Sequence, residues 1–140
     1  MRTRAPILLI FEDDPATALM VKVFFTSHGW QVYSAPDAEQ AESLIRSVRP
    51  DAVLMDVWMP GIDGITCLRK LTCDARAFPI PPIVLWSADV LSDLKRQAMA
   101  AGATAFVSKP GILRELLKTI TTSTDAARAA RSAGVSSPKP

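Results

Sequence analysis

Cysteine, net charge and long apolar runs are all scarce in this sequence. The 140 residues carry 16 Lys and Arg against 14 Asp and Glu, which leaves a net charge of only +2. So small an excess gives the chain no strong attraction to nucleic acid or to anionic lipid. No apolar run approaches the roughly 20 residues that a membrane-spanning helix requires. We therefore expect a soluble globular protein that binds neither a membrane nor nucleic acid directly.

The two cysteines, Cys67 and Cys73, do not have the CxxC spacing of redox and zinc sites. We expect them to be ordinary thiols in a reducing compartment. Residues 1–4 include two arginines, but the apolar run at 7–11 is too short for a signal peptide and ends at Glu12. Together these features predict a cytoplasmic protein.

Apolar residues make up 49% of the chain, which is long enough for one domain with a buried core. They form short apolar runs that alternate with amphipathic stretches. Strands are predicted at residues 6–11, 31–35, 52–56, 83–86 and 105–107. Helices are predicted at about 15–27, 38–48, 65–72, 92–101 and 113–122. This alternation is typical of a doubly wound α/β fold, in which helices cover both faces of a five-stranded parallel sheet.

Local signals predict several helix ends. Asp14-Pro15 marks the start of the first helix, with Asp14 as the N-cap, and Gly29 marks its end. Asp37 is predicted to cap the second helix. The apolar residues of the first helix that we expect to face the sheet are Leu19, Met20, Val23 and Phe24.

The composition changes after residue 122, where Ser, Ala, Arg and Pro become frequent. We therefore expect a folded domain at 5–122 and a flexible tail at 123–140. Within that tail, residues 126–130 could extend the last helix by a turn or two.

Polar side chains follow four of the five predicted strands. Glu12 and Asp13 come after the first strand, and Asp56 ends the third, just before the turn signals of residues 59–64. Ser87 follows the fourth strand and Lys109 the fifth. Because the carboxyl ends of parallel strands meet at one edge of the sheet, these side chains are expected to converge on one cleft.

Three carboxylates in one cleft repel each other unless a cation relieves them. Oxygen ligands of this kind suit Mg²⁺, and Lys109 in the same cleft indicates that an anionic group is also held there. A carboxylate nucleophile, a metal and a lysine are the components of phosphoryl transfer to an aspartate. Each residue also has an ordinary structural explanation: Asp56 as a turn cap, Ser87 as a loop hydroxyl, Lys109 as a surface lysine. Their convergence from different strands favours the chemical explanation.

Four segments, ILLIFEDDP, LMDVWMPGIDG, IVLWSA and FVSKP, occur in this order along the chain. In this combination and spacing, residues 6–122 resemble a response-regulator receiver domain, the phospho-acceptor module of two-component signalling. The resemblance implies a flavodoxin-like fold with the strand order 2-1-3-4-5.

The resemblance also implies a role for each polar residue of the cleft. Asp56 would accept the phosphoryl group and share in binding Mg²⁺. Asp13 would bind the metal directly, Glu12 through water, and Trp58 through its backbone carbonyl. The size of the Trp58 side chain is a departure from the family pattern, one that would shield the acyl phosphate from water or slow small phosphodonors.

Three further positions take their roles from the same resemblance. Ser87 would donate a hydrogen bond to a phosphoryl oxygen, and Lys109 would pair with the phosphoryl charge. Phe106 stands at the position of a switch aromatic, although a lone aromatic in a buried strand is more often only part of the core. Pro110 would follow a cis peptide bond that directs Lys109 into the cleft. Gly111 is a departure, since an aromatic residue is frequent there, and it would loosen the entry to the last helix.

The function implied is a signalling switch rather than an enzyme, with at most self-phosphotransfer and autodephosphorylation. A histidine kinase or a histidine phosphotransfer protein would donate the phosphoryl group. The helix at 92–101, the strand at 105–107 and the helix at 113–122 would then bind a target protein, or a second copy of the chain. Three alternatives remain: a fragment of a larger regulator with an output domain, a receiver that works without phosphate, and a small aspartyl-phosphate phosphatase. Such a phosphatase has a DxDx[TV] motif after the first strand, where this chain has EDD, and a cap domain, which it lacks.

Overall fold

The computed structural model describes residues 4–73, 79–89, 92–109 and 113–132. Its strands are β1 (Ile7–Phe11), β2 (Gln31–Ala35), β3 (Ala52–Asp56), β4 (Ile83–Ser87) and β5 (Ala105–Ser108). Its helices are α1 (Pro15–Ser27), α2 (Ala41–Val48), α3 (Gly64–Cys73), α4 (Ser92–Ala100) and α5 (Leu113–Ser132). All neighbouring strands pair in parallel, in the order β2-β1-β3-β4-β5. The predicted fold and strand order are confirmed.

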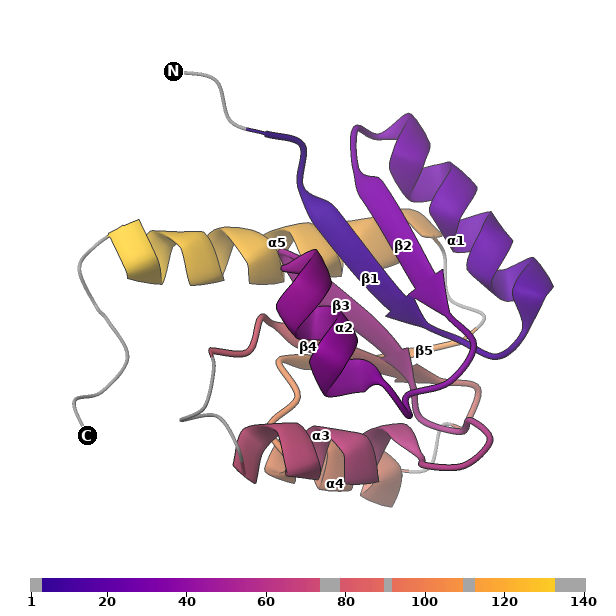
Figure 1. The fold of residues 1–140 in the computed structure, drawn as a ribbon. Helices are drawn as coiled ribbons and strands as arrows, with labels where there is room; N and C mark the ends of the chain where they lie inside the picture. The colour runs from indigo at the N-terminus through magenta and orange to yellow at the C-terminus, as the bar shows by residue number, and fades with distance from the viewer. Residues whose placement is uncertain (1–3, 74–78, 90–91, 110–112, 133–140) are drawn as a thin grey trace.

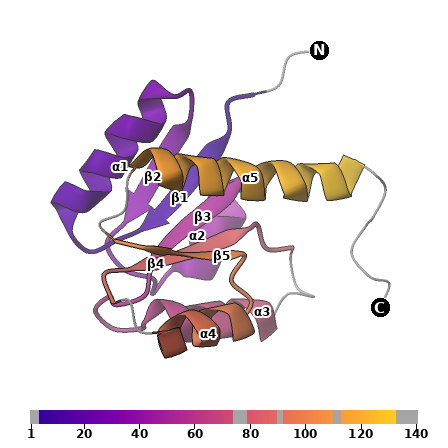
Figure 2. The same ribbon diagram turned by 180° about the vertical axis from the view of Figure 1, so that it is seen from behind.

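Helices cover both faces of the sheet, as Figures 1 and 2 show from opposite sides. Buried residues of α1 and α5 form one apolar cluster with one face of the sheet, and those of α2, α3 and α4 form a second cluster with the other face. Every residue of β3 is buried, because this central strand has a layer of helices on each side. Because all the strand pairs are parallel, the carboxyl ends of the strands lie together at one edge of the sheet and the amino ends at the other.

The ends of α1 are as predicted. The Asp14 carboxylate accepts a hydrogen bond from the Thr17 N–H at 3.3 Å, and Pro15 is the first residue of the helix. After the helix, Gly29 has a φ of 90°, which a residue with a side chain rarely adopts.

The buried face of α1 is not the one predicted. Ala18, Val21 and Phe25 are buried, and the Phe25 ring meets Trp30 edge-on with centroids 5.6 Å apart. Of the residues expected inside, Phe24 is half-buried, while Leu19, Met20 and Val23 are 60%, 51% and 60% exposed. The helix is apolar around most of its circumference, so periodicity could not decide which face meets the sheet. An apolar face of α1 is consequently left in solvent.

The start of α2 also differs from the prediction. The helix begins at Ala41, and the Asp37 carboxylate accepts a hydrogen bond from the Glu39 N–H at 3.0 Å, within the preceding turn. Asp37 therefore stabilises the turn and does not cap the helix. At the other end, Arg49 has a φ of 53°, the one positive value at a non-glycine position in the described segments.

Helix α5 ends at Ser132 rather than near Thr122, so residues 123–132 of the expected tail are helical, and the extension considered for residues 126–130 is present. Ser123 and Thr124 are buried, and Arg128 forms an ion pair of 3.2 Å with Asp51 at the start of β3. These contacts hold a segment that composition alone marked as tail, and α5 extends past the amino-terminal edge of the sheet (Figure 1). No helix in the described part of the chain has the length and apolar content to cross a membrane.

Candidate functional site

The carboxyl edge of the sheet gathers the predicted polar residues. Glu12 directly follows β1, Asp56 is the last residue of β3, Ser87 is the last residue of β4, and Lys109 directly follows β5. The parallel register aligns the ends of these strands, since Asp56 pairs with Trp86 and Ser87 with Ser108. Residues that are distant in sequence are thereby brought to one edge of the sheet.

Three carboxylates form the centre of this edge. Ligand oxygens of Glu12, Asp13 and Asp56 all lie within 4.8 Å of one another. Glu12 and Asp56 are only 3% and 6% exposed, whereas Asp13 is exposed to solvent. A set of hard oxygen donors with one side open to water fits Mg²⁺, which keeps several water ligands in proteins.

Lys109 bridges the two buried carboxylates. Its ammonium donates to Glu12 Oε1 at 2.7 Å and to Asp56 Oδ2 at 3.1 Å, and it lies 4.7 Å from the centre of the Trp86 ring. Burial alone would lower the pKa of Lys109, but the contacts with Glu12 and Asp56 outweigh burial and raise it. Burial, together with the nearby charge of Asp56, raises the pKa of Glu12 against the lowering effect of the Lys109 contact. The lysine therefore provides the positive charge that this acidic cleft requires.

Backbone groups orient both carboxylates. The Asp14 N–H donates to Glu12 Oε2 at 3.1 Å, and the Trp58 N–H donates to Asp56 Oδ1 at 3.3 Å. The Trp58 side chain itself is 55% exposed. Each acid thus has one oxygen held by an amide and the other held by the ammonium of Lys109.

Gly64 supports the site in a way that the sequence did not reveal. Its N–H donates to the carbonyl of Val57 at 2.7 Å, and a Cβ at this position would lie 2.5 Å from the carbonyl oxygen of Asp56. Only glycine allows α3 to start this close to the end of β3. The sequence indicated a turn at Asp63-Gly64, but a close approach between two backbone segments leaves no local pattern.

Trp86 contributes both to the apolar core and to the site. The Lys109 ammonium lies over the Trp86 ring, and the cation–π interaction between them stabilises the position of the lysine. The indole N–H is buried and has no hydrogen-bond partner among the described residues. No sequence signal links Trp86 to Lys109, because the contact depends on the pairing of β4 with β5.

Ser87 ends β4 at this edge, whereas Phe106 lies further back, at the position of β5 that pairs with Leu85. The Ser87 side chain is fully buried, and its hydroxyl oxygen accepts a hydrogen bond from the Asp89 N–H at 3.0 Å. Phe106 is half-buried and packs against the cluster formed with α2, α3 and α4. Pro110, with its predicted cis bond, and Gly111 lie outside the described residues.

A hollow of about 300 Å³ adjoins the carboxylates. Its lining includes Glu12 and Asp13 together with Leu19 and Lys22 of α1. Leu19, on the exposed apolar face of α1, thus borders the same hollow as the two acids. A second molecule that reaches the carboxylates from this side would rest on that face.

Comparison with known proteins places this arrangement among signalling domains. A family model for the response regulator receiver domain matches residues 8–121. Protein PilH of Pseudomonas aeruginosa is 36% identical over 113 residues, which cover 81% of this chain and 93% of PilH. The BeF3-activated N-terminal receiver domain of Klebsiella pneumoniae RstA superposes with a TM-score of 0.77 at 27% identity, covering 84% of this chain and 97% of that domain.

Some relatives are longer than this chain. The DNA-binding dual master transcriptional regulator RpaA of Synechocystis is 31% identical over 112 residues, which cover 80% of this chain but only 46% of RpaA. The chain thus spans nearly all of PilH and about half of RpaA. The likeness to RpaA concerns the shared domain and not the remainder of that protein.

Proposed function

We propose that in this chain, which belongs to the response-regulator receiver family, Asp56 accepts a phosphoryl group from a phosphohistidine. The observation that carries the proposal is the buried Asp56 carboxylate held between Lys109 and the Trp58 N–H, next to a second buried acid, Glu12. A buried carboxylate that served only as a turn cap would not need a lysine and two further acids around it.

Glu12, Asp13 and Asp56 would hold Mg²⁺ in this site, with the backbone carbonyl of Trp58 as a further ligand and Glu12 acting through water. When bound, the metal would neutralise negative charge on the carboxylates and on the phosphoryl oxygens. The donor set supports the assignment, since it consists of oxygens and is exposed at Asp13.

In the transfer itself, an oxygen of Asp56 attacks phosphorus in line with the bond to the donor imidazole. The O–P bond forms as the N–P bond breaks, and the imidazole leaves with the electron pair of the old bond. Lys109, which pairs with Glu12 and Asp56 in the structure, would move its charge to the transferred phosphoryl oxygens. Its position within reach of both acids supports this role.

The phosphodonor, a histidine kinase or a histidine phosphotransfer protein, would rest on α1. Leu19, Met20 and Val23 form an exposed apolar face, and Leu19 lines the hollow that leads to Glu12 and Asp13. Docking there brings a phosphohistidine to the carboxylates from the open side. Val23→Lys should therefore slow transfer from the phosphohistidine protein while leaving phosphorylation by acetyl phosphate unchanged. The matched control is Met99→Lys, at an exposed methionine of α4.

The output would be a change on the face formed by α4, β5 and α5. The Ser87 hydroxyl, which now accepts from the Asp89 N–H, would turn to a phosphoryl oxygen and draw the following loop inward. That movement would make room beside β5 for Phe106, which is only half-buried. The changed face would bind a target protein, or a second copy of the chain as a homodimer. The activity is thus signalling, with at most self-phosphotransfer and autodephosphorylation.

The acceptor is tested by incubation with acetyl phosphate and Mg²⁺, followed by intact mass spectrometry. One phosphoryl group should be added and should be removed by hydroxylamine, as expected of an acyl phosphate. Asp56→Asn should abolish the addition, and Asp63→Asn, which changes a neighbouring carboxylate at the start of α3, should leave it intact. Equal labelling of the parent and Asp56→Asn would overturn the assignment.

A second candidate is a receiver that belongs to a larger regulator. The observation that favours it is the length of RpaA, a DNA-binding regulator of which this chain covers 46%. In that case the α4, β5 and α5 face would contact an output domain of the same protein. The genomic reading frame decides between the two arrangements, and the chemistry at Asp56 is the same in both.

A further inference from the structure

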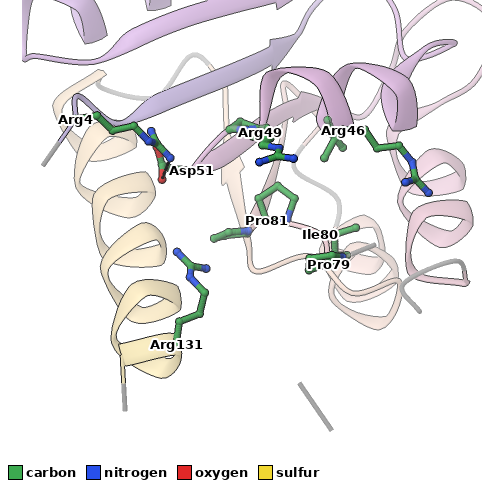
Figure 3. A pocket seen from close by; sticks show the side chains of 11 residues that line it. Arg4, Arg46, Arg49, Asp51, Pro79, Ile80, Pro81 and Arg131 are labelled. Carbon is green, nitrogen blue, oxygen red and sulfur yellow. Dashed lines mark hydrogen bonds and ion pairs between the residues drawn. The ribbon is translucent and has the colours of Figure 1, made fainter. Parts of the chain in front are cut away.

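A pocket of about 530 Å³ lies at the amino-terminal edge of the sheet, opposite the carboxylates (Figure 3). It is bounded by the segment before β1, the end of α2, the start of β3, the segment before β4 and the last turns of α5. Its lining residues are Arg4, Ile45, Arg46, Arg49, Pro50, Asp51, Pro79, Ile80, Pro81, Pro82 and Arg131. Four arginines against a single acid make this lining strongly basic.

Asp51, the one acid of the lining, already has partners for both of its carboxylate oxygens. Its side chain is 6% exposed and accepts a hydrogen bond from the Ile7 N–H at 2.8 Å. It also pairs with Arg4 at 3.0 Å and with Arg128 at 3.2 Å. Because two guanidinium groups neutralise this carboxylate, it would not repel an incoming anion.

Arg49 and Arg131 have no carboxylate partner among the described residues. Figure 3 shows both side chains extending toward Pro81, Arg49 from the residue that follows α2 and Arg131 from the last turn of α5. Arg46, by contrast, pairs with Glu42 at 3.1 Å and extends to the other side of the view. Guanidinium groups bind phosphate through paired N–H donors, and these two line the same pocket from positions far apart in the chain.

The rest of the pocket is apolar. Ile45 and Ile80, together with the four prolines of the lining, provide surface with few hydrogen-bond donors. A volume of about 530 Å³ is within the range of small-molecule sites, roughly 300–1,000 Å³. An inorganic anion alone would leave that surface unused, so the site suits an anion attached to a larger, partly apolar body.

Arg49 lies at the carboxyl end of α2 and caps that helix. Its backbone N–H donates to the carbonyl of Ile45 at 3.0 Å, and its φ of 53° is the left-handed conformation in which helices often end. The cap fixes the backbone from which the Arg49 side chain extends into the lining of the pocket.

We propose that this pocket binds a small molecule of the nucleoside phosphate class. Arg49 and Arg131 hold the phosphate groups, and the base lies on the surface formed by Ile80 and the neighbouring prolines. The site is separate from the carboxylates at the other edge of the sheet and does not depend on phosphorylation of Asp56.

The test is a calorimetric titration of the full chain with ADP in EDTA, which removes divalent cations that could carry the nucleotide to the carboxylates. ADP should bind at one site, and adenosine or pyrophosphate alone should bind at least tenfold more weakly. Amide NMR signals of Arg49, Asp51 and Ile80 should shift with ADP. The signal of Gly64, at the opposite edge, should not.

Two variants test whether Arg49 and Arg131 bind the phosphate groups of ADP. Arg49→Asn keeps a residue that tolerates the left-handed conformation, and Arg131→Gln keeps a helix former, so both should fold, as circular dichroism would check. Each should weaken ADP binding at least tenfold. Arg114→Gln, at the opposite end of α5, should bind as the parent does, and so should Asp56→Asn.

Several outcomes would overturn the proposal. These are no binding of ADP at millimolar concentration, equal weakening by Arg114→Gln, or pyrophosphate binding as tight as that of ADP. Tighter binding of an acidic peptide than of ADP would likewise replace the nucleotide with a protein segment as the occupant.

Discussion

The replacement Asp51→Asn should destabilise the protein and remove part of its pH dependence. Asp51 joins the segment before β1, the start of β3 and the last turns of α5 through one buried carboxylate. Asparagine has a similar shape and can still accept from the Ile7 N–H, but it cannot pair with Arg4 and Arg128. The change therefore removes charge and leaves the backbone contact in place.

The size of the effect follows from those contacts. Hydrogen bonds to charged groups contribute about 1.5–3 kcal/mol, and loss of a buried ion-pair partner costs more. The Arg4 and Arg128 side chains are 60% and 38% exposed, so both guanidinium groups can return to water in the variant. We expect a loss of about 2 kcal/mol, which for a domain of this size lowers the melting temperature by roughly 8 °C.

The sign of the pH dependence is also determined. Burial by itself would raise the pKa of Asp51, but the hydrogen bonds from Ile7, Arg4 and Arg128 outweigh burial and lower it. A carboxylate with a lowered pKa stabilises the fold above its unfolded value, about 3.9, and the effect is lost as pH falls through the folded value. The difference between parent and variant should be constant from pH 7 to 5 and should shrink below pH 4.

Urea unfolding followed by circular dichroism at several pH values measures this difference directly. Asp125→Asn is the matched control, since Asp125 is exposed on the same helix as Arg128. Other groups titrate equally in both proteins and cancel in the comparison. A difference below about 0.5 kcal/mol at pH 7, or one that grows as the pH falls, would refute the reasoning.

Three further predictions concern the site and the thiols. Mg²⁺ should change the fluorescence of Trp58, whose N–H donates to Asp56, and Asp13→Ala should abolish the change; an unaltered titration would remove Asp13 from the metal ligands. Ser87→Ala should leave phosphorylation by acetyl phosphate intact but reduce the gain in target binding that beryllofluoride produces, about 5- to 150-fold in ordinary allosteric proteins; an unchanged gain would exclude Ser87 as the relay. Exposed Cys73 should react with a thiol reagent at pH 8 within minutes, whereas Cys67, whose pKa burial raises to about 11, should react only on unfolding; equal rates in the native protein would contradict this.

The convergence of the acidic residues and Lys109 was predictable because it depends on strand order and direction alone. Short apolar runs alternate with helical patterns, such alternation implies parallel strands, and parallel strands end at one edge. Each polar residue was already at the end of its strand in the sequence. Their distances required the structure, since 2.7 Å between Lys109 and Glu12 depends on side-chain conformations.

The buried face of α1 was not predictable for a related reason. Periodicity identifies a face only when the other side of the helix is polar, and α1 has apolar residues on both sides. Phe25 lies in the core because it packs against Trp30 and the sheet. The apolar face that remained exposed is the one proposed to receive the phosphodonor, so the incorrect assignment concerned a surface of functional interest.

The fold class and the edge at which the acids meet follow from patterns within short segments, and the strand order follows from the family resemblance. The sequence also allowed residues 126–130 to extend the last helix, and α5 continues to Ser132. Two features required the packed structure: Gly64 must lack a side chain, and Arg49 and Arg131 line one pocket. Both depend on contacts between segments far apart in the chain, and such contacts are set by how the helices pack on the sheet.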